Sequence, residues 1–560
     1  MSRPQKWKFP SKLFAMETSQ SIGAYLIQRL YTHGVRHVFG VPGDYVLGFY
    51  QQLVESPLQI VNTCDEQGAG FAADAYARVR GLGVVCITYC VGGLKVANTT
   101  AQAFAEKSPV VVISGAPGTK ERVKNPLLHH KVRDFDTQYK VFEQLTVAST
   151  VLSDPETALR EIDRVLAAAL RYKRPVYIEI PRDMVSAPGL AAYRPPELQD
   201  TSDPDALGEA IREAADMINA ARQPVIIAGV ELHRFGLQDV LLQFVEKTNI
   251  PVASLLLSKS VIAERHPRYL GVYEGALGYE DVRAYVEASD CLILLGAIMS
   301  DMDLGMYTAN LDLGRSIYVT SERTSIRHHI YEGILPRDFL QRLSVANIAP
   351  RETGPIPHPV MPAAFSPIPG QKVTVQRLFQ RLNAFLDDNT VVIAEPGDSL
   401  FGSADLFIHG HTEFLSPAYY TSMGFAVPAC LGAQLANPQL RPLVIVGDGG
   451  FQMTGMELST AVRFKLNPIV VVLNNCGYGT ERPMLDGPFN DVLPWRFSRI
   501  PEILGSGKGF DIETEEQLDA ALQAARAYTD GFCILDVHLD PHDISPALQR
   551  MTSMLGKRVK

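Results

Sequence analysis

Short apolar runs alternate with longer amphipathic segments along most of the chain. The apolar runs are rich in valine and isoleucine and span residues 110–116, 224–230, 291–297, 442–449 and 468–475. Unbroken runs of this kind are typical of strands that helices cover on both faces, as in parallel sheets. The segments between them, such as 155–170 and 205–221, have the spacing of amphipathic helices. The pattern therefore predicts an α/β fold built from doubly wound parallel sheets.

Two segments rich in proline and glycine, at 186–205 and 349–370, interrupt this pattern. Such segments cannot hold helical or ladder hydrogen bonds, and they usually separate domains. We therefore expect three α/β domains, at 1–190, 200–348 and 371–560. A chain of 560 residues is long enough for about three or four domains.

Composition narrows the range of partners. The net charge of −9 is spread along the chain, whereas nucleic-acid-binding proteins usually have a basic surface. No apolar run reaches the roughly 18 residues of a membrane span. The seven cysteines form no CxxC pair, which indicates reduced thiols and a cytoplasmic protein. Residues 1–15 are basic without an apolar stretch, so a disordered leader is favoured over a targeting peptide.

The strongest chemical signal lies in the third predicted domain. Asp448 follows one apolar run and Asn475 follows the next, 27 positions later (475 − 448). This spacing is about one helical crossover, which brings both residues to the carboxyl ends of adjacent parallel strands, where α/β sheets bind ligands. Magnesium prefers oxygen ligands, and Asp448, Asn475 and the carbonyl of Gly477 could supply three. An ordinary strand–turn–helix stays the alternative reading of this segment.

The same segment is suited to binding a phosphate group. Glycines at 447, 449 and 450 allow the backbone to approach a phosphate closely. The helix predicted to follow them would point free N–H groups at the anion. The segment therefore combines a metal site with a phosphate site.

Acidic residues and histidines are placed where the first domain is expected to have loops. Asp44 follows a Pro-Gly pair, Glu66 precedes a predicted helix, and His129 and His130 form a doublet. Taken singly, each has a structural explanation, as a turn residue, a helix-capping acid or a solvated loop residue. Their significance depends on whether they act together.

These motifs together resemble those of thiamin-diphosphate enzymes. The sequence GDGG…NNCGYG at 447–479 is similar to their cofactor motif, and 39–49 and 63–78 are similar to their pyrimidine-binding domain. The His129-His130 doublet, with Asp44 and Glu481, resembles the branch of pyruvate, indolepyruvate and phenylpyruvate decarboxylases.

The resemblance implies a domain order and a set of cofactor contacts. The three domains would be pyrimidine-binding, middle and diphosphate-binding, and a C-terminal helix at 544–556 would close the site. The middle domain has no G-x-G-x-x-G motif after its first strand, so we expect it to be structural. The implied cofactors are thiamin diphosphate and Mg²⁺, with the metal on Asp448, Asn475 and Gly477. The implied cofactor-binding residues are Glu66 on the pyrimidine ring, Met423 under the bent cofactor, and Gly447, Asp448, Gly449, Gly450, Asn475 and Gly477 around the diphosphate.

The activity implied is non-oxidative decarboxylation of a 2-oxo acid to an aldehyde and CO₂, through a thiamin-diphosphate enamine. The implied catalytic residues are Glu66, Asp44, His129, His130 and Glu481. The implied assembly is a homodimer or homotetramer with active sites at the dimer interface, without nucleic acid or membrane partners.

The substrate is less strongly indicated. Leu400, Phe401, Thr480 and Met302 are expected to line the substrate pocket. Resemblance of residues 127–146 to phenylpyruvate decarboxylases favours an aromatic or branched 2-oxo acid such as phenylpyruvate or indolepyruvate. The chain departs from the family at 397–402, where Gly-Asp replaces the usual Gly-Thr, and at Gly479-Thr480, where Thr and then Ile or Val are usual. A pyruvate decarboxylase, a carboligase of the acetolactate synthase type and a non-catalytic cofactor-binding protein stay as alternatives.

Overall fold

The computed structural model describes most of the chain. It covers residues 20–196, 200–352, 354–359, 363–409 and 413–559, with side chains described as far as Thr552. The expected leader at 1–15 lies outside the described residues, as do parts of both proline-rich segments.

The first α/β unit contains a six-stranded sheet in the order β2-β1-β3-β4-β6-β5, and all its strands are parallel. Its strands are β1 (His37–Gly40), β2 (Gln59–Asn62), β3 (Gly83–Ile87), β4 (Val110–Ala116), β5 (Ala148–Val151) and β6 (Val176–Pro181). Its helices are α1 (Ile22–Thr32), α2 (Leu47–Val54), α3 (Glu66–Arg80), α4 (Ala97–Ala105), α5 (Thr137–Leu145) and α6 (Ala158–Tyr172).

The second unit contains seven strands in the order β13-β12-β11-β10-β7-β8-β9. Its strands are β7 (Pro224–Ala228), β8 (Val252–Ser254), β9 (Tyr269–Val272), β10 (Cys291–Leu295), β11 (Ser316–Val319), β12 (Thr324–Ile326) and β13 (His329–Tyr331). Its helices are α7 (Pro204–Ala220), α8 (Glu231–Arg234), α9 (Gln238–Thr248), α10 (Glu280–Glu287) and α11 (Pro336–Val345). The edge strands β12 and β13 are antiparallel, because only two residues connect them and a parallel pair needs a long crossover.

The third unit contains a six-stranded parallel sheet in the order β15-β14-β16-β17-β19-β18. Its strands are β14 (Thr390–Ala394), β15 (Phe414–Leu415), β16 (Arg441–Gly447), β17 (Ile469–Asn474), β18 (Lys508–Ile512) and β19 (Cys533–His538). Its helices are α12 (Val375–Asn383), α13 (Asp398–Ala404), α14 (Ala426–Ala436), α15 (Asp448–Thr454), α16 (Leu458–Arg463), α17 (Ile500–Leu504), α18 (Glu515–Ala527) and α19 (Pro546–Val559).

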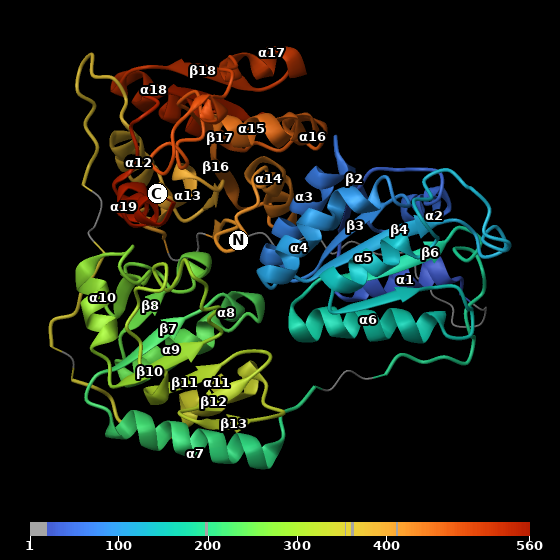
Figure 1. The fold of residues 1–560 in the computed structure, drawn as a ribbon, viewed down its shortest axis with the longest axis horizontal. Helices are drawn as coiled ribbons and strands as arrows, with labels where there is room; N and C mark the ends of the chain where they lie inside the picture. The colour runs from blue at the N-terminus through green and yellow to red at the C-terminus, as the bar shows by residue number, and fades with distance from the viewer. Residues whose placement is uncertain (1–19, 197–199, 353, 360–362, 410–412, 560) are drawn as a thin grey trace, which may run out of the picture.

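The three units confirm the predicted α/β fold with parallel-dominated sheets. The apolar runs at 110–116 and 442–449 form the buried strands β4 and β16, and the predicted helix at 205–221 is α7. The antiparallel hairpin of the second unit was not predicted. Figure 1 shows the first unit on the right, the second at the lower left and the third at the upper left.

The first and third units share one hydrophobic core. Helices α3 and α14 pack face to face, and Phe71 of α3 meets Phe425, at the start of α14, edge to face at 5.7 Å between ring centroids. The approach is so close that a Cβ at Gly432 would lie 2.0 Å from the carbonyl oxygen of Ala72. This contact fixes the first unit to the third within one chain. No helix among the described residues is both long and apolar enough to cross a bilayer.

Candidate active site

The carboxyl ends of β16 and β17 place Asp448 and Asn475 at one edge of the third sheet. The two strands are parallel neighbours, and Gly447 pairs with Leu473. Asp448 begins α15 directly after β16, and Asn475 follows the last residue of β17. The predicted crossover geometry is therefore present at this edge.

Asp448 is a buried carboxylate held by backbone N–H groups. Its Oδ1 accepts from Gly449 N–H at 2.7 Å, and its Oδ2 accepts from Gly477 N–H at 3.2 Å. Burial raises the pKa of Asp448 to about 6, because the charged form loses its hydration. A bound cation would offset that cost, as in other buried carboxylate sites that hold a metal.

Two glycines next to Asp448 are required by close packing. A Cβ at Gly449 would lie 2.6 Å from the Tyr478 ring, and a Cβ at Gly450 would lie 2.9 Å from the Glu395 side chain. Neither position has room for a larger residue, because the Tyr478 ring and the Glu395 side chain occupy the space. Apart from Gly449 N–H, which donates to Asp448, the N–H groups at the start of α15 could bind an anion at this edge of the sheet.

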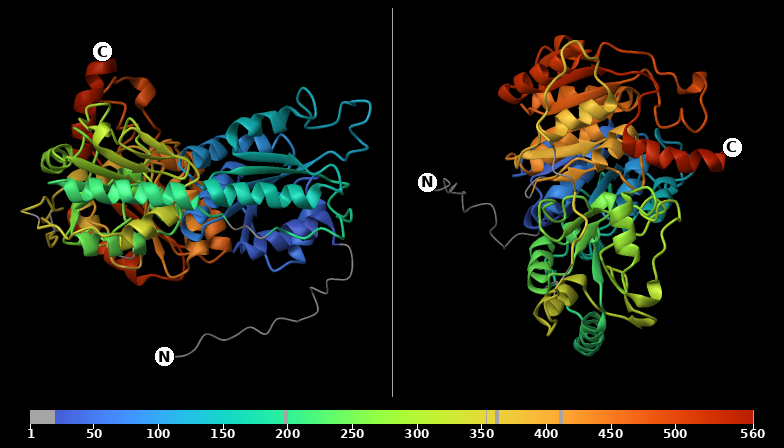
Figure 2. Two further views of the ribbon diagram at one scale, coloured as in Figure 1. Left: turned by 90° about the horizontal axis from the view of Figure 1, so that it is seen from below. Right: turned by 90° about the vertical axis from the view of Figure 1, so that its left-hand side faces the viewer.

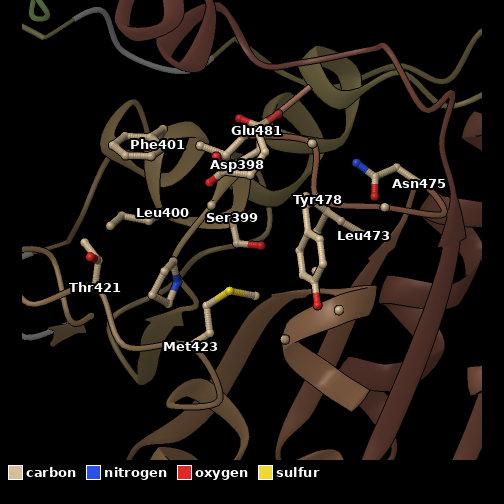
Figure 3. A pocket seen from close by; sticks show the side chains of 18 of the residues that line it. Asp398, Ser399, Leu400, Phe401, Thr421, Met423, Leu473, Asn475, Tyr478 and Glu481 are labelled. Carbon is tan, nitrogen blue, oxygen red and sulfur yellow. The ribbon is translucent and has the colours of Figure 1, made fainter. Parts of the chain in front are cut away.

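A cavity of about 280 Å³ opens at this edge (Figure 3). Its lining includes every residue predicted for the metal, the diphosphate and the substrate pocket, together with Met423 and Glu481. These residues are Met302, Leu400, Phe401, Met423, Gly447, Asp448, Gly449, Gly450, Asn475, Gly477, Thr480 and Glu481. In Figure 3, Met423 points into the cavity between Ser399 and Tyr478. The carboxylate, amide and backbone oxygens at residues 448, 475 and 477 form a donor set that fits Mg²⁺, so the site suits a metal-bound diphosphate.

Glu395, a residue that the sequence analysis missed, holds the loop that carries Met423. It follows β14, is 1% exposed, and accepts from the N–H groups of Gly424 and, at 2.7 Å, Ala426. Burial raises the pKa of Glu395 to about 7. By fixing the two N–H groups that follow Met423, this carboxyl group orients the apolar floor of the cavity.

Other cavity residues were also missed. Ser399, Tyr478 and Met484 line it, and Met551 reaches it from the C-terminal helix α19. Met551 lies 67 residues after Met484 (551 − 484), in a segment without a recognisable motif. From the sequence, only the expected C-terminal closing helix indicated that Met551 would lie near the cavity.

The first unit gathers the predicted Asp44, His129 and His130 at the carboxyl ends of β1 and β4. His129 Nε2 lies 2.7 Å from Asp44 Oδ2, and the two imidazole rings meet edge to face at 4.8 Å between centroids. Tyr45 stacks on His129 at 4.8 Å. His130 has a left-handed backbone, and its Nδ1 is buried without a partner among the described residues. Three groups that can hold or release protons therefore share one loop cluster.

Glu66 is the first residue of α3, directly after the helix cap Asp65. Asp65 accepts from Gln67 N–H at 2.8 Å, which fixes the start of the helix. The carboxylate of Glu66 accepts from Lys95 Nζ at 2.6 Å, and Glu66 is 9% exposed. Glu66 is thus a rigidly placed acid near the surface of the first unit.

A single chain does not bring Glu66 to the cavity that contains Asp448. Glu457 accepts from the N–H groups of Cys64 at 3.0 Å and Asp65 at 3.1 Å, which ties the start of α3 to the far end of the α15 segment. Asp448 lies at the opposite end of that segment, and neither Glu66 nor the Asp44–His129–His130 cluster lines the cavity. Within one chain, the predicted residues therefore form two separate groups, a Glu66 half in the first unit and an Asp448 half in the third.

Comparison with known proteins matches three segments of the chain to domains of thiamine pyrophosphate enzymes. Residues 20–138 match the N-terminal TPP binding domain of thiamine pyrophosphate enzymes, 211–335 match their central domain, and 401–537 match their C-terminal TPP binding domain. Similar proteins include an indole-3-pyruvate decarboxylase of Azospirillum brasilense, 36% identical over 94% of this chain and 96% of the relative. An alpha-keto-acid decarboxylase of Mycobacterium leprae (strain TN) is 33% identical over 96% of each chain. One from Mycolicibacterium paratuberculosis is 34% identical over 94% of this chain and 95% of the relative. The chain thus belongs to the thiamine-pyrophosphate-dependent 2-oxo acid decarboxylases, and it is a carboxy-lyase.

Proposed function

We propose that this enzyme decarboxylates a bulky 2-oxo acid, aromatic or branched, such as phenylpyruvate or indolepyruvate, to an aldehyde and CO₂. The observation that carries the proposal is the wall of the cavity. Four methionines line it, at positions 302, 423, 484 and 551, together with Leu400 and Phe401. Methionine side chains are flexible and polarisable, so such a wall adapts to large apolar groups. The similarity to an indole-3-pyruvate decarboxylase supports the same size of substrate.

The two halves have different tasks in this proposal. Asp448, Asn475 and the Gly477 carbonyl hold Mg²⁺ and the diphosphate, and Glu66 holds the pyrimidine ring. Thiamin diphosphate, when bound, supplies a carbon nucleophile and then accepts the electron pair that carbon dioxide leaves behind. Glu66 keeps a proton at the ring nitrogen, as general acid–base catalysis requires.

The remaining polar groups move protons and act on the substrate carboxylate. Asp44 and His129 are hydrogen-bonded at 2.7 Å, so the pair can pass a proton between them. His130 lies beside them, and Glu481 lines the cavity of the other half. With Glu481 nearby, the negative charge of the substrate carboxylate would be disfavoured, which promotes loss of CO₂.

The proposal requires a second copy of the chain, because the two halves lie apart within one. Exposed apolar side chains lie near both units: Val91 and Leu94 lie beside Lys95, the partner of Glu66, and Met453 and Met456 lie in the segment that joins Asp448 to the start of α3. Exposed apolar surface of this kind is typical of an interface. We propose a homodimer or a pair of dimers, in which Glu66 of one chain meets Asp448 of the other. All seven cysteines are free, which supports a cytoplasmic location.

A substrate series tests the proposed activity. With thiamin diphosphate and Mg²⁺, we expect kcat/KM for phenylpyruvate or indolepyruvate to exceed that for pyruvate by about tenfold or more, because burying the larger side chain adds about 1–3 kcal/mol. Thr480→Ile narrows the cavity and should reduce this ratio. Thr529→Ile, at an exposed position, is the matched control. Preference for pyruvate, or an acyloin instead of an aldehyde as main product, would overturn the proposal.

A further inference from the structure

The C-terminal helix α19 closes the cavity from the side of the second unit. Met551 of α19 lines the cavity, and Ala547 and Leu548 pack with Phe401 and Leu277 in one hydrophobic cluster. Figure 1 shows α19 beside α13, and Figure 2 shows that its end lies at the outer surface of the molecule. A helix at this place controls access to the cavity, so the contacts that hold it matter for the reaction.

Asp398 holds the start of this helix. It begins α13, lines the same cavity and is 9% exposed. Its Oδ1 accepts from the hydroxyl of Ser545, and its Oδ2 accepts from Ser545 N–H at 2.8 Å. Ser545 lies 147 residues away in the sequence, directly before α19. Both oxygens of the buried Asp398 carboxylate therefore accept hydrogen bonds from Ser545, the residue directly before α19.

Ser545 also bonds the first turn of α19, so it links Asp398 to the helix. Its Oγ accepts from Leu548 N–H at 3.0 Å, so Ser545 is the N-cap of α19. The same hydroxyl thus donates to Asp398 and accepts from the first turn of the helix. Burial raises the pKa of Asp398 to about 6. This value still lies below neutral pH, so the carboxylate is charged there and both of its hydrogen bonds are charge-assisted.

A second, weaker tether lies one turn further along α19. Arg550 donates to Asp405 at 3.2 Å and to the Leu277 carbonyl at 3.1 Å, which links the helix to the second unit. Asp405 and Arg550 are both about a quarter exposed, so water screens this pair more than the buried Asp398 contact. Of these two polar contacts, the buried one between Asp398 and Ser545 is screened less by water.

We propose that Asp398 is a positioning residue that acts through Ser545: it holds α19 closed over the cavity, which keeps water out and places Met551 against the substrate. The inference rests on the proposed function of the cavity. It also assigns a structural role to the aspartate at the Gly-Asp departure from the family pattern, because its side chain is turned to the closing helix.

The test is a double-substitution cycle in the full-length enzyme loaded with thiamin diphosphate and Mg²⁺. Asp398→Asn keeps one acceptor oxygen, and Ser545→Ala removes the hydroxyl donor and the cap but keeps the backbone N–H that donates to Asp398. We expect each to lower kcat for phenylpyruvate about tenfold, the size of a lost charge-assisted hydrogen bond. The affinity for the cofactor should change less than about threefold, since neither Asp398 nor Ser545 is among the proposed metal ligands. Tryptic cleavage after Arg550 should become about tenfold faster in both variants, because α19 opens more often.

Three outcomes decide the inference. The double variant should be slowed by less than the product of the two single effects, because both substitutions act on one contact. Ser545→Thr, which keeps the hydroxyl, should retain kcat and protease resistance. If Asp398→Asn still lowers kcat about tenfold in the Ser545→Ala background, Asp398 acts directly in the cavity and the inference is wrong. Unchanged cleavage after Arg550 in both single variants would also overturn it. Absence of decarboxylation in the unsubstituted enzyme would contradict the proposed function instead, and the cleavage assay would still report on the contact.

Discussion

Glu66→Gln should lower turnover about 10³-fold, within the range for loss of a general acid–base group, and should leave the folded protein intact. The substitution keeps the shape and one acceptor oxygen of the side chain, so α3 and its Asp65 cap stay in place. In the role that we propose for Glu66, it removes the exchangeable proton at the pyrimidine end of the cofactor. Steady-state kinetics with saturating cofactor, together with the melting temperature, measures the effect.

Glu55→Gln is the matched control for this substitution. Glu55 is an exposed glutamate at the end of α2 in the same unit, where its side chain accepts from Gln51. We expect its kcat to equal that of the unsubstituted enzyme. Retention of more than about a tenth of the activity by Glu66→Gln would contradict the assigned role, since an acid–base group contributes at least about 10²-fold.

Asp448→Ala should abolish metal-dependent binding of thiamin diphosphate. Removing a group that only supports a metal ligand weakens metal affinity about 10- to 100-fold, and Asp448 is proposed to be a ligand itself, so the loss should be larger. The N–H groups of Gly449 and Gly477 would also lose their acceptor, which loosens the first turn of α15. Calorimetric titration of the cofactor with and without Mg²⁺ gives the affinity directly.

Asp511→Asn provides the comparison for Asp448→Ala. Asp511 lies on β18 of the same sheet, is exposed, and pairs with His538 outside the cavity. Its substitution should leave cofactor affinity unchanged. If Asp448→Ala binds the cofactor as tightly as Asp511→Asn does, the metal site must be sought elsewhere.

The sequence predicted where Asp448 and Asn475 lie because the signal for this geometry is local. Asp448 and Asn475 each follow an apolar strand, and adjacent parallel strands end at one edge of the sheet, so their meeting follows from the pattern alone. The cluster of Asp44 with His129 depended on the family resemblance, because nothing in the local pattern around either residue indicates that loops after β1 and β4 converge.

Contacts between distant segments could not be predicted in this way. The bond of Asp398 to Ser545 and that of Glu457 to the backbone at 64–65 join segments without any shared periodicity. The same holds for Glu395, whose side chain serves a loop about thirty residues further on. Such contacts fix distant segments against one another, and only the folded structure reveals them.

The measurement that tests the central claim most directly is the activity of mixed dimers. Chains with Glu66→Gln and chains with Asp448→Asn are co-expressed, and doubly tagged dimers that contain one of each are isolated. If each site combines Glu66 of one chain with Asp448 of its partner, one of the two sites in such a dimer is intact, and we expect about half of the unsubstituted activity. If both groups instead acted within one chain, every site would carry a defect, and activity no greater than that of the single variants would contradict the account.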